Sequence, residues 1–158
     1  MEKSLAVLKN SSFIKPWLIL FGTTGFIFLF STGFYWVEAG WLTETARQFF
    51  STVCHQFSWR TFAPHDIHMA VCSRCFGIYS GLFVGAVLSP VFFMFGRWWL
   101  NYTILFAGIA LLLNIADFSG NFIGLWTNTL YSRLITGLLL GLSASMFIVS
   151  AILKQIKS

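Results

Sequence analysis

The chain has 158 residues, of which 57% are hydrophobic and only 9% are charged, and its mean hydropathy is +0.77. A soluble domain carries about 25% charged residues, so this composition excludes an ordinary water-facing surface and indicates an integral membrane protein. The formal net charge of +5 fits the excess of Lys and Arg that membrane proteins keep on the cytoplasmic side. The sequence has no basic run interleaved with aromatic residues, so it predicts no nucleic-acid partner.

Four apolar runs are long enough to cross a bilayer, which takes about 20 residues per helix. They lie at about 17–36, 76–95, 98–116 and 134–153. The first run is too long and too aromatic for a signal peptide, so we interpret it as an uncleaved anchor. We therefore predict one all-α domain over residues 1–158, a four-helix transmembrane bundle surrounded by lipid.

Charge predicts how this bundle is oriented. With both termini inside, the inner segments hold Glu2 and six basic residues: Lys3, Lys9, Lys15, Arg97, Lys154 and Lys157. The outer segments balance four arginines with four acidic residues, so the bias of Lys and Arg predicts that the N- and C-termini are inside. The loops at about 37–75 and 117–133 then lie on the outer face of a prokaryotic cell membrane.

The first outer loop opens with apolar residues at helical spacing, with polar residues opposite: Leu42, Ala46, Phe49, Phe50, Val53 and Phe57. This pattern predicts an amphipathic helix. Two roles remain open for it, lying in the membrane interface or packing on the outer ends of the spans.

Small residues recur every four positions on two of the spans. They are Gly77, Gly81 and Gly85 on the second span and Gly137, Gly141 and Ser145 on the fourth. Small residues at this spacing let helix backbones approach closely in lipid. We expect the second and fourth spans to pack through these faces, on each other or across a homo-oligomer interface.

All three cysteines lie in or beside the first outer loop, and three interpretations compete. Cys54, Cys72 and Cys75 with one imidazole, from His55 or His68, would bind a tetrahedral metal ion such as zinc. Cys72 and Cys75 could instead form a redox pair at a helix start, where the helix dipole and Arg74 favour a thiolate. A plain disulfide that leaves one cysteine over is the third interpretation.

A second polar group lies at the outer ends of the spans. Asp117 ends the third apolar run and could form a structural ion pair with Arg133 or Arg74. Alternatively Asp117 acts as a general base or ligand beside the cysteines, and Arg133 binds an anionic group such as a lipid phosphate. Arg60 could bind such a group too, or extend to the interface.

Several of these residues belong to longer sequence elements: Cys54-His55-Gln56, Arg60-Thr61-Phe62, Val71-Cys72-Ser73-Arg74-Cys75-Phe76-Gly77-Ile78-Tyr79-Ser80-Gly81, and later Asp117, Asn128, Arg133, Thr136 and Gly137. Together they resemble a family of small bacterial and archaeal membrane proteins that is classed as a domain of unknown function. The resemblance covers about residues 54–141. It departs from the family pattern at Ser58, where proline is common, and at Phe118, where glycine is common.

The resemblance implies a shared site made of Cys54, His55, Arg60, Cys72, Arg74, Cys75, Tyr79, Asp117 and Arg133. His65 and His68 do not match the family pattern, which favours His55 as the fourth metal ligand. The resemblance implies no particular activity. A membrane metalloenzyme, a thiol–disulfide oxidoreductase and an accessory subunit or assembly factor of a larger membrane complex all remain open.

Overall fold

The computed structural model describes residues 11–34, 40–94 and 98–157, which fold into helices and connecting segments without a strand. The helices are α2 (Ser11–Ser31), α3 (Gly40–Phe50), α4 (Ser73–Met94), α5 (Trp98–Ile123) and α6 (Leu130–Lys157), with short 3-10 turns η1 (Ser58–Arg60) and η2 (Pro64–Asp66). In this part of the chain α2, α4, α5 and α6 are long and apolar enough to cross a membrane. The predicted all-helical bundle with four spans is confirmed.

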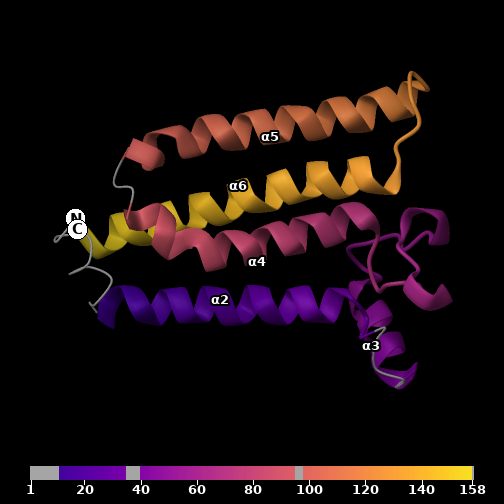
Figure 1. The fold of residues 1–158 in the computed structure, drawn as a ribbon, viewed down its shortest axis with the longest axis horizontal. Helices are drawn as coiled ribbons and strands as arrows, with labels where there is room; N and C mark the ends of the chain where they lie inside the picture. The colour runs from indigo at the N-terminus through magenta and orange to yellow at the C-terminus, as the bar shows by residue number, and fades with distance from the viewer. Residues whose placement is uncertain (1–10, 35–39, 95–97, 158) are drawn as a thin grey trace.

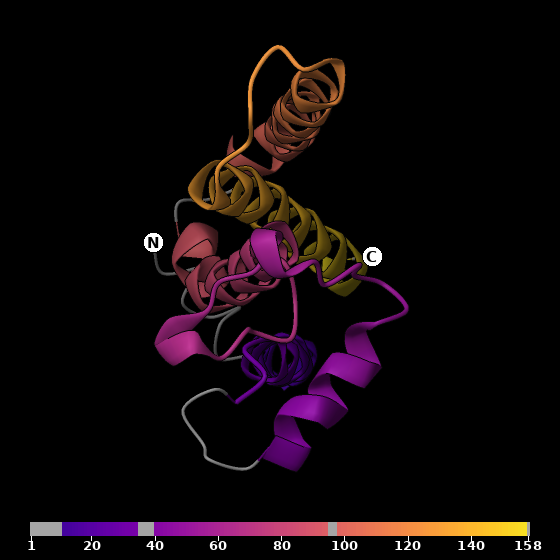
Figure 2. The same cartoon turned by 90° about the vertical axis from the view of Figure 1, so that its right-hand side faces the viewer.

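The four long helices run alongside one another in the order α2, α4, α6, α5 (Figure 1). The first turn of α2 and the last turn of α6 lie at one end of the bundle. The segments 51–72 and 124–129 lie at the opposite end, which we call the cysteine end. The short helix α3 crosses this end beside α2 (Figure 2).

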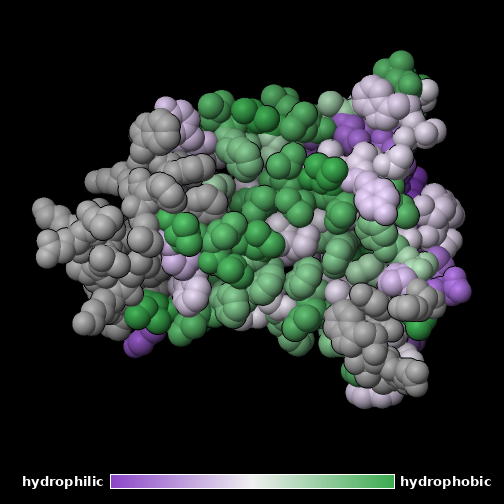
Figure 3. All heavy atoms as spheres, viewed as in Figure 1, coloured by the Kyte–Doolittle hydropathy of each residue, from purple (hydrophilic) through white to green (hydrophobic). Residues whose placement is uncertain are grey.

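Apolar side chains cover the middle of the visible face, and hydrophilic residues gather at the cysteine end (Figure 3). Large apolar side chains on α5 such as Ile104 and Leu112 are 70% and 66% exposed. Hydrophobic side chains this exposed on a spanning helix are suited to contact with lipid tails.

Glycines bring α4 and α6 into backbone contact. A Cβ added at Gly77 or Gly81 would overlap the backbone carbonyl oxygens of Leu134 and Leu138, and one added at Gly141 would overlap that of Ile78. The expected packing of these two spans on each other is therefore confirmed. It occupies, within one chain, the faces that a homo-oligomer would otherwise use.

We expect Gly141→Ala to destabilise the protein by about 1–3 kcal/mol, because the new methyl group would force two backbones apart. Gly108→Ala is the matched control, since nothing lies within 4 Å of a Cβ built at that position on α5. The control should be neutral or slightly stabilising, by up to about 1 kcal/mol, because alanine favours helix. Thermal unfolding of both variants in mild detergent measures the difference, and equal midpoints would contradict the close packing.

Pro90 frees a carbonyl of α4 that then accepts a hydrogen bond from α2. Proline has no N–H, so the carbonyl of Ala86, four residues earlier, has no backbone partner within the helix. The indole Nε1 of Trp17 on α2 donates to this oxygen at 3.0 Å, and the Ser89 hydroxyl donates at 2.8 Å. A carbonyl that lipid cannot satisfy is thereby paired by a neighbouring helix.

The structure differs from the predicted boundaries at two helix ends. The helix α2 ends at Ser31, well before Trp36, because Gly33 and Phe34 take left-handed backbone angles (φ 70° and 52°). Gly33 fits there because a Cβ would lie 3.1 Å from the backbone nitrogen of Ala70. The amphipathic helix α3 ends at Phe50, and Val53 lies exposed beyond it.

The last two helices extend further toward the cysteine end than their apolar runs do. α5 continues past residue 116 to Ile123, and α6 begins at Leu130 rather than at about 134. The added turns of α5 carry Asp117 and Asn121, whose side chains pair with Arg74 on α4 and with Asn128 before α6. Lys3, Lys9 and the two residues between the second and third predicted spans, Gly96 and Arg97, lie outside the described residues.

Candidate metal centre

Cys72 and Cys75 straddle the first turn of α4. The helix begins at Ser73, and the carbonyl of Cys72 accepts the first helical bond, from Phe76 N–H at 2.9 Å. Cys72 is therefore the N-cap residue and Cys75 the third helical residue. The free N–H groups and the dipole at a helix N-terminus stabilise negative charge, which suits thiolates.

Cys54 reaches the same point from the other side of the loop. Its N–H donates to the carbonyl of Phe50 at 2.8 Å, so the chain turns directly after α3. The Cys54 side chain is only 5% exposed and packs with Ala70 and Val71. Its Sγ accepts the backbone N–H of Cys72 at 3.2 Å.

The three sulfurs of Cys54, Cys72 and Cys75 all lie within 4.8 Å of one another, and all three cysteines are free thiols. Sulfurs bound to one tetrahedral zinc at 2.3 Å are about 3.8 Å apart. The observed spacing therefore needs only a small inward movement to close around an ion. Among the described residues, no other group of three or more such side chains comes this close.

The neighbouring thiols act on the charge of Cys72. Hydrogen bonds from the side chains of Cys54 and Cys75 lower the pKa of Cys72, and partial burial opposes them without cancelling the shift. Backbone N–H groups of the α4 turn act in the same direction. The lowered pKa favours the thiolate of Cys72, the form that binds metal and attacks disulfides.

The pH dependence of Cys72 alkylation, measured in reduced and chelator-treated protein, tests the lowered pKa of Cys72. We expect Cys72 to react with iodoacetamide at pH values well below the ordinary thiol pKa of about 8.5, because a depressed pKa keeps the thiolate present as pH falls. A Cys72 profile that rises only above pH 8 would contradict the lowered pKa.

His55 lies on the rim of the thiol cluster. It lines a hollow of about 110 Å³ together with the three cysteines, Gln56 and Arg60. Small-molecule pockets span about 300–1,000 Å³, so this hollow fits an ion or a water-sized group. The His55 ring is exposed and stacks on Phe57 at 5.8 Å, outside the close group of sulfurs. His55 as the fourth ligand stays a prediction, and it would have to leave this stack.

Of the other two histidines, His68 takes no part in the cluster. His68 is half-buried and does not join the close group of sulfurs. The side chain of His65 lies outside the described part of the structure.

Gln56 positions the loop in a way that sequence reasoning did not assign. Its backbone is left-handed, with a φ of 50°, and its side-chain Nε2 donates to the Arg47 carbonyl at 2.6 Å. That carbonyl lies in the last turn of α3, where carbonyls lack helical partners. The bond ties the segment after Cys54 back onto α3. The place of Gln56 in the Cys-His-Gln element was the sequence feature that could have indicated this structural role.

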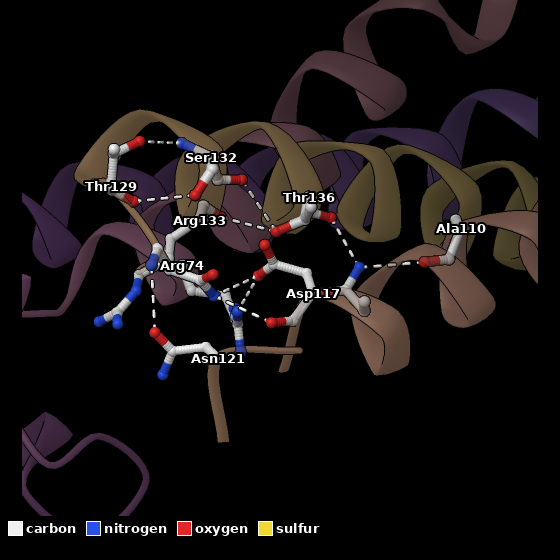
Figure 4. Close-up of polar contacts among 10 residues, drawn as sticks. Arg74, Ala110, Asp117, Asn121, Thr129, Ser132, Arg133 and Thr136 are labelled. Carbon is white, nitrogen blue, oxygen red and sulfur yellow. Dashed lines mark hydrogen bonds and ion pairs between the residues drawn. The ribbon is translucent and has the colours of Figure 1, made fainter. Parts of the chain in front are cut away.

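The second polar group surrounds Asp117 (Figure 4). Its carboxylate forms an ion pair with Arg74, which selects Arg74 from the two partners the sequence allowed. Asn128 Nδ2 donates to the Asp117 carboxylate at 2.8 Å, and Asn121 Oδ1 accepts the Asn128 N–H at 3.1 Å. The group therefore joins α4, the end of α5 and the segment before α6.

The other candidate residues lie around the thiols and the ion pair. Tyr79 packs on Phe50, with ring centres 5.4 Å apart, and lies within electrostatic reach of the three cysteines. Arg60 lines the hollow, and Arg133 on α6 is within electrostatic reach of Arg60 and of the Arg74–Asp117 pair. The predicted site residues thus gather at one end of the bundle.

Fold and site together define a small multi-span membrane protein with a cluster of three thiols at one end of its bundle. Residues 54–147 match the family model described as "Predicted membrane protein (DUF2085)", so the chain belongs to that family. It is also 30% identical to an uncharacterised protein of Methanocaldococcus jannaschii over 151 residues, covering 92% of this chain and 90% of the relative. No solved structure matches the chain.

Proposed function

We propose that Cys54, Cys72 and Cys75 bind one transition-metal ion, most suitably Zn²⁺, and that this centre is the functional site of the protein. The observation that carries the proposal is the approach of the three sulfurs to within 4.8 Å of one another. Three thiolates leave one tetrahedral position for His55 or for water. A water there would make the centre an open site of the kind that catalyses, and His55 would close it as a structural one.

Two features of this chain support metal binding. The backbone N–H of Cys72 donates to the sulfur of Cys54, the kind of outer hydrogen bond that orients a metal ligand. The lowered pKa of Cys72 favours its thiolate, so a metal ion competes less strongly with a proton at that ligand.

A thiol–disulfide oxidoreductase is the second candidate, and the same cluster supports it. A thiolate at the N-cap of α4, three residues from a second thiol, has the layout of a redox-active pair. Oxidation would join the thiolate and the thiol as a disulfide, release the one proton of the thiol and pass two electrons to an acceptor such as a quinone or a partner disulfide. Cys54, buried beside the pair, would be the partner thiol.

Differential alkylation separates the two candidates. Protein purified in mild detergent is divided into three samples, which receive no pretreatment, a chelator or a thiol reductant. Each sample is then alkylated with iodoacetamide, and the alkylation of each cysteine is quantified by mass spectrometry. Zinc binding predicts that the chelator alone exposes all three cysteines, because metal ligation protects the sulfurs. A disulfide predicts that the reductant alone exposes two of them. Protection that only the reductant removes would contradict the metal proposal.

We also propose that the cysteine end faces outward, with both termini in the cytoplasm of a prokaryotic cell. The charge bias of the chain supports this orientation, since Lys15 and the lysines near its C-terminus lie at the end opposite the cysteines. A reporter that functions only in the cytoplasm should be active when it is fused after Ser158. Activity of an exclusively external reporter at that position would reverse the orientation.

An accessory subunit of a larger membrane complex is the third candidate, and a structural zinc would serve that role equally well. It predicts that the protein purifies from its native membrane with larger partners that are lost after extraction in harsher detergent.

A further inference from the structure

Three arginines gather at the cysteine end with too few acidic partners. Asp117 pairs with Arg74, and the positive charges of Arg60 and Arg74 both act on Arg133. Asp117 supplies the opposing carboxylate. Three guanidinium groups therefore share one carboxylate. A zinc ion held by three thiolates would add one net negative charge, which is too little to remove the positive surplus.

The arginines also carry donors without acceptors. The Nε atoms of Arg60, Arg74 and Arg133 are each buried with no hydrogen-bond partner. Buried donors without acceptors are costly, and more so on charged groups. Asn128 Oδ1 is a buried acceptor without a partner, but it is neutral and cannot balance a charge. The cluster is thus short of both an acceptor and a negative charge, and one anion would provide both.

The depth of the arginines indicates the class of anion. Arg74 is the second residue of the candidate span Ser73–Val91, and Arg133 is the fourth of Leu130–Ile152. Both therefore lie where a span meets the headgroup layer, the level of phospholipid phosphates. The planar fork of arginine matches phosphate oxygens in pairs.

Arg60 is positioned before any ligand arrives. Its guanidinium carbon lies 5.3 Å from the ring centre of Phe57 and 6.0 Å from that of Trp59. Cation–π contacts of this kind restrict the Arg60 side chain but leave its N–H groups free to donate hydrogen bonds. A positioned donor loses less conformational freedom when it binds.

We propose that Arg60, Arg74 and Arg133 bind a phosphate group at the cysteine end, beside the thiol cluster. Asp117 and Asn128 hold Arg74 in place, and the unpaired Nε donors and the charge surplus attract the anion. The phosphate comes either from a phospholipid headgroup or from a soluble phosphate or phosphate ester. The inference does not depend on the metal proposal, because the surplus charge exists without the metal.

Two probes test the proposal on the full-length, delipidated protein in mild detergent. Titration calorimetry uses inorganic phosphate, and native mass spectrometry counts lipids retained after incubation with vesicles of phosphatidylglycerol and phosphatidylcholine in equal amounts. We expect saturable binding of about one phosphate-bearing ligand per chain in at least one arm. Arg133→Gln and Arg60→Gln should each weaken it at least about tenfold, as loss of a charge-assisted hydrogen bond does.

Arg47→Gln is the matched control, because it removes the same charge from α3 but lies outside the arginine cluster, and it should bind as the wild type does. Binding of phosphatidylglycerol alone would identify a lipid headgroup as the source, and binding of inorganic phosphate would identify a soluble ligand. Both results support the phosphate site. The proposal is overturned if neither probe binds to the wild type, or if Arg60→Gln, which alters only the loop, binds as tightly as Arg47→Gln.

Discussion

Serine in place of Cys54 is expected to lower the zinc affinity of the protein by at least about 100-fold. The side chain is 5% exposed, so the substitution changes one atom in a packed position and leaves the neighbouring backbone supported. Losing a direct ligand should exceed the roughly 10–100-fold cost of losing an outer hydrogen bond to a ligand. Cys75→Ser should have a similar effect, because the sulfurs would share one ion. Competition with a chromophoric zinc chelator measures each affinity.

Two histidine variants calibrate this result. His68→Ala should bind zinc as the wild type does, since His68 does not join the close group of sulfurs. His55→Ala should lose less than about tenfold, because three thiolates supply most of the binding free energy and water can take the fourth position. Full zinc affinity in Cys54→Ser would exclude Cys54 as a ligand. A loss in His55→Ala as large as in Cys54→Ser would identify His55 as a ligand of the closed site.

Asp117→Ala should destabilise the protein by about 3 kcal/mol. The side chains of Arg74 and Asp117 are only 23% and 12% exposed, so removing the carboxylate leaves a buried guanidinium without its partner. Asn128 Nδ2 loses its side-chain acceptor at the same time and keeps only the Asp117 backbone carbonyl, at 3.2 Å. Unfolding in detergent, followed by circular dichroism against increasing denaturant, measures the change in free energy.

The control for this prediction is Glu44→Ala, which removes an exposed carboxylate from α3 and should change stability by no more than about 0.5 kcal/mol. A double variant tests the cause. If the cost comes from an unpaired charge, Arg74→Leu combined with Asp117→Ala should be more stable than Asp117→Ala alone. Additive effects of the two substitutions would show that the pair does not act as a unit.

The sequence predicted the parts of this structure that depend on local pattern. Composition and the lengths of the apolar runs were sufficient to predict four spans, because a bilayer leaves few structures other than helices for an apolar segment of that length. The spacing of Gly77, Gly81 and Gly141 predicted that two backbones would meet, and α4 and α6 do. The Cys-x-x-Cys spacing placed Cys72 and Cys75 on one helical turn.

The parts that depend on tertiary contacts were not predictable from pattern. The end of α2 is set by the fit of Gly33 against Ala70, which lies in a distant segment. The choice of Arg74 over Arg133 as the partner of Asp117 depends on how α5 lies against α4 and α6. The direction of the His55 ring depends on its stack with Phe57 and on the left-handed backbone at Gln56. None of these has a periodic signature in the sequence.

The thiol cluster and the arginine cluster share a boundary, because Arg60 lines the hollow beside the three sulfurs and also acts on Arg133. A phosphate bound to the arginines would therefore lie beside the thiols. If the fourth metal position is open, that arrangement suits an enzyme that acts on a phosphate-bearing substrate at the membrane surface. If His55 closes it, the metal stabilises the loop that carries Arg60.

The metal content of the wild-type protein tests the central claim most directly. Protein purified in mild detergent, with neither chelator nor added metal, is analysed for transition metals by elemental mass spectrometry and for protein by amino-acid analysis. The three-thiolate centre predicts about one zinc, or one other transition metal, per chain. Metal far below one per chain, with two of the three cysteines joined as a disulfide, would contradict it and favour the redox pair.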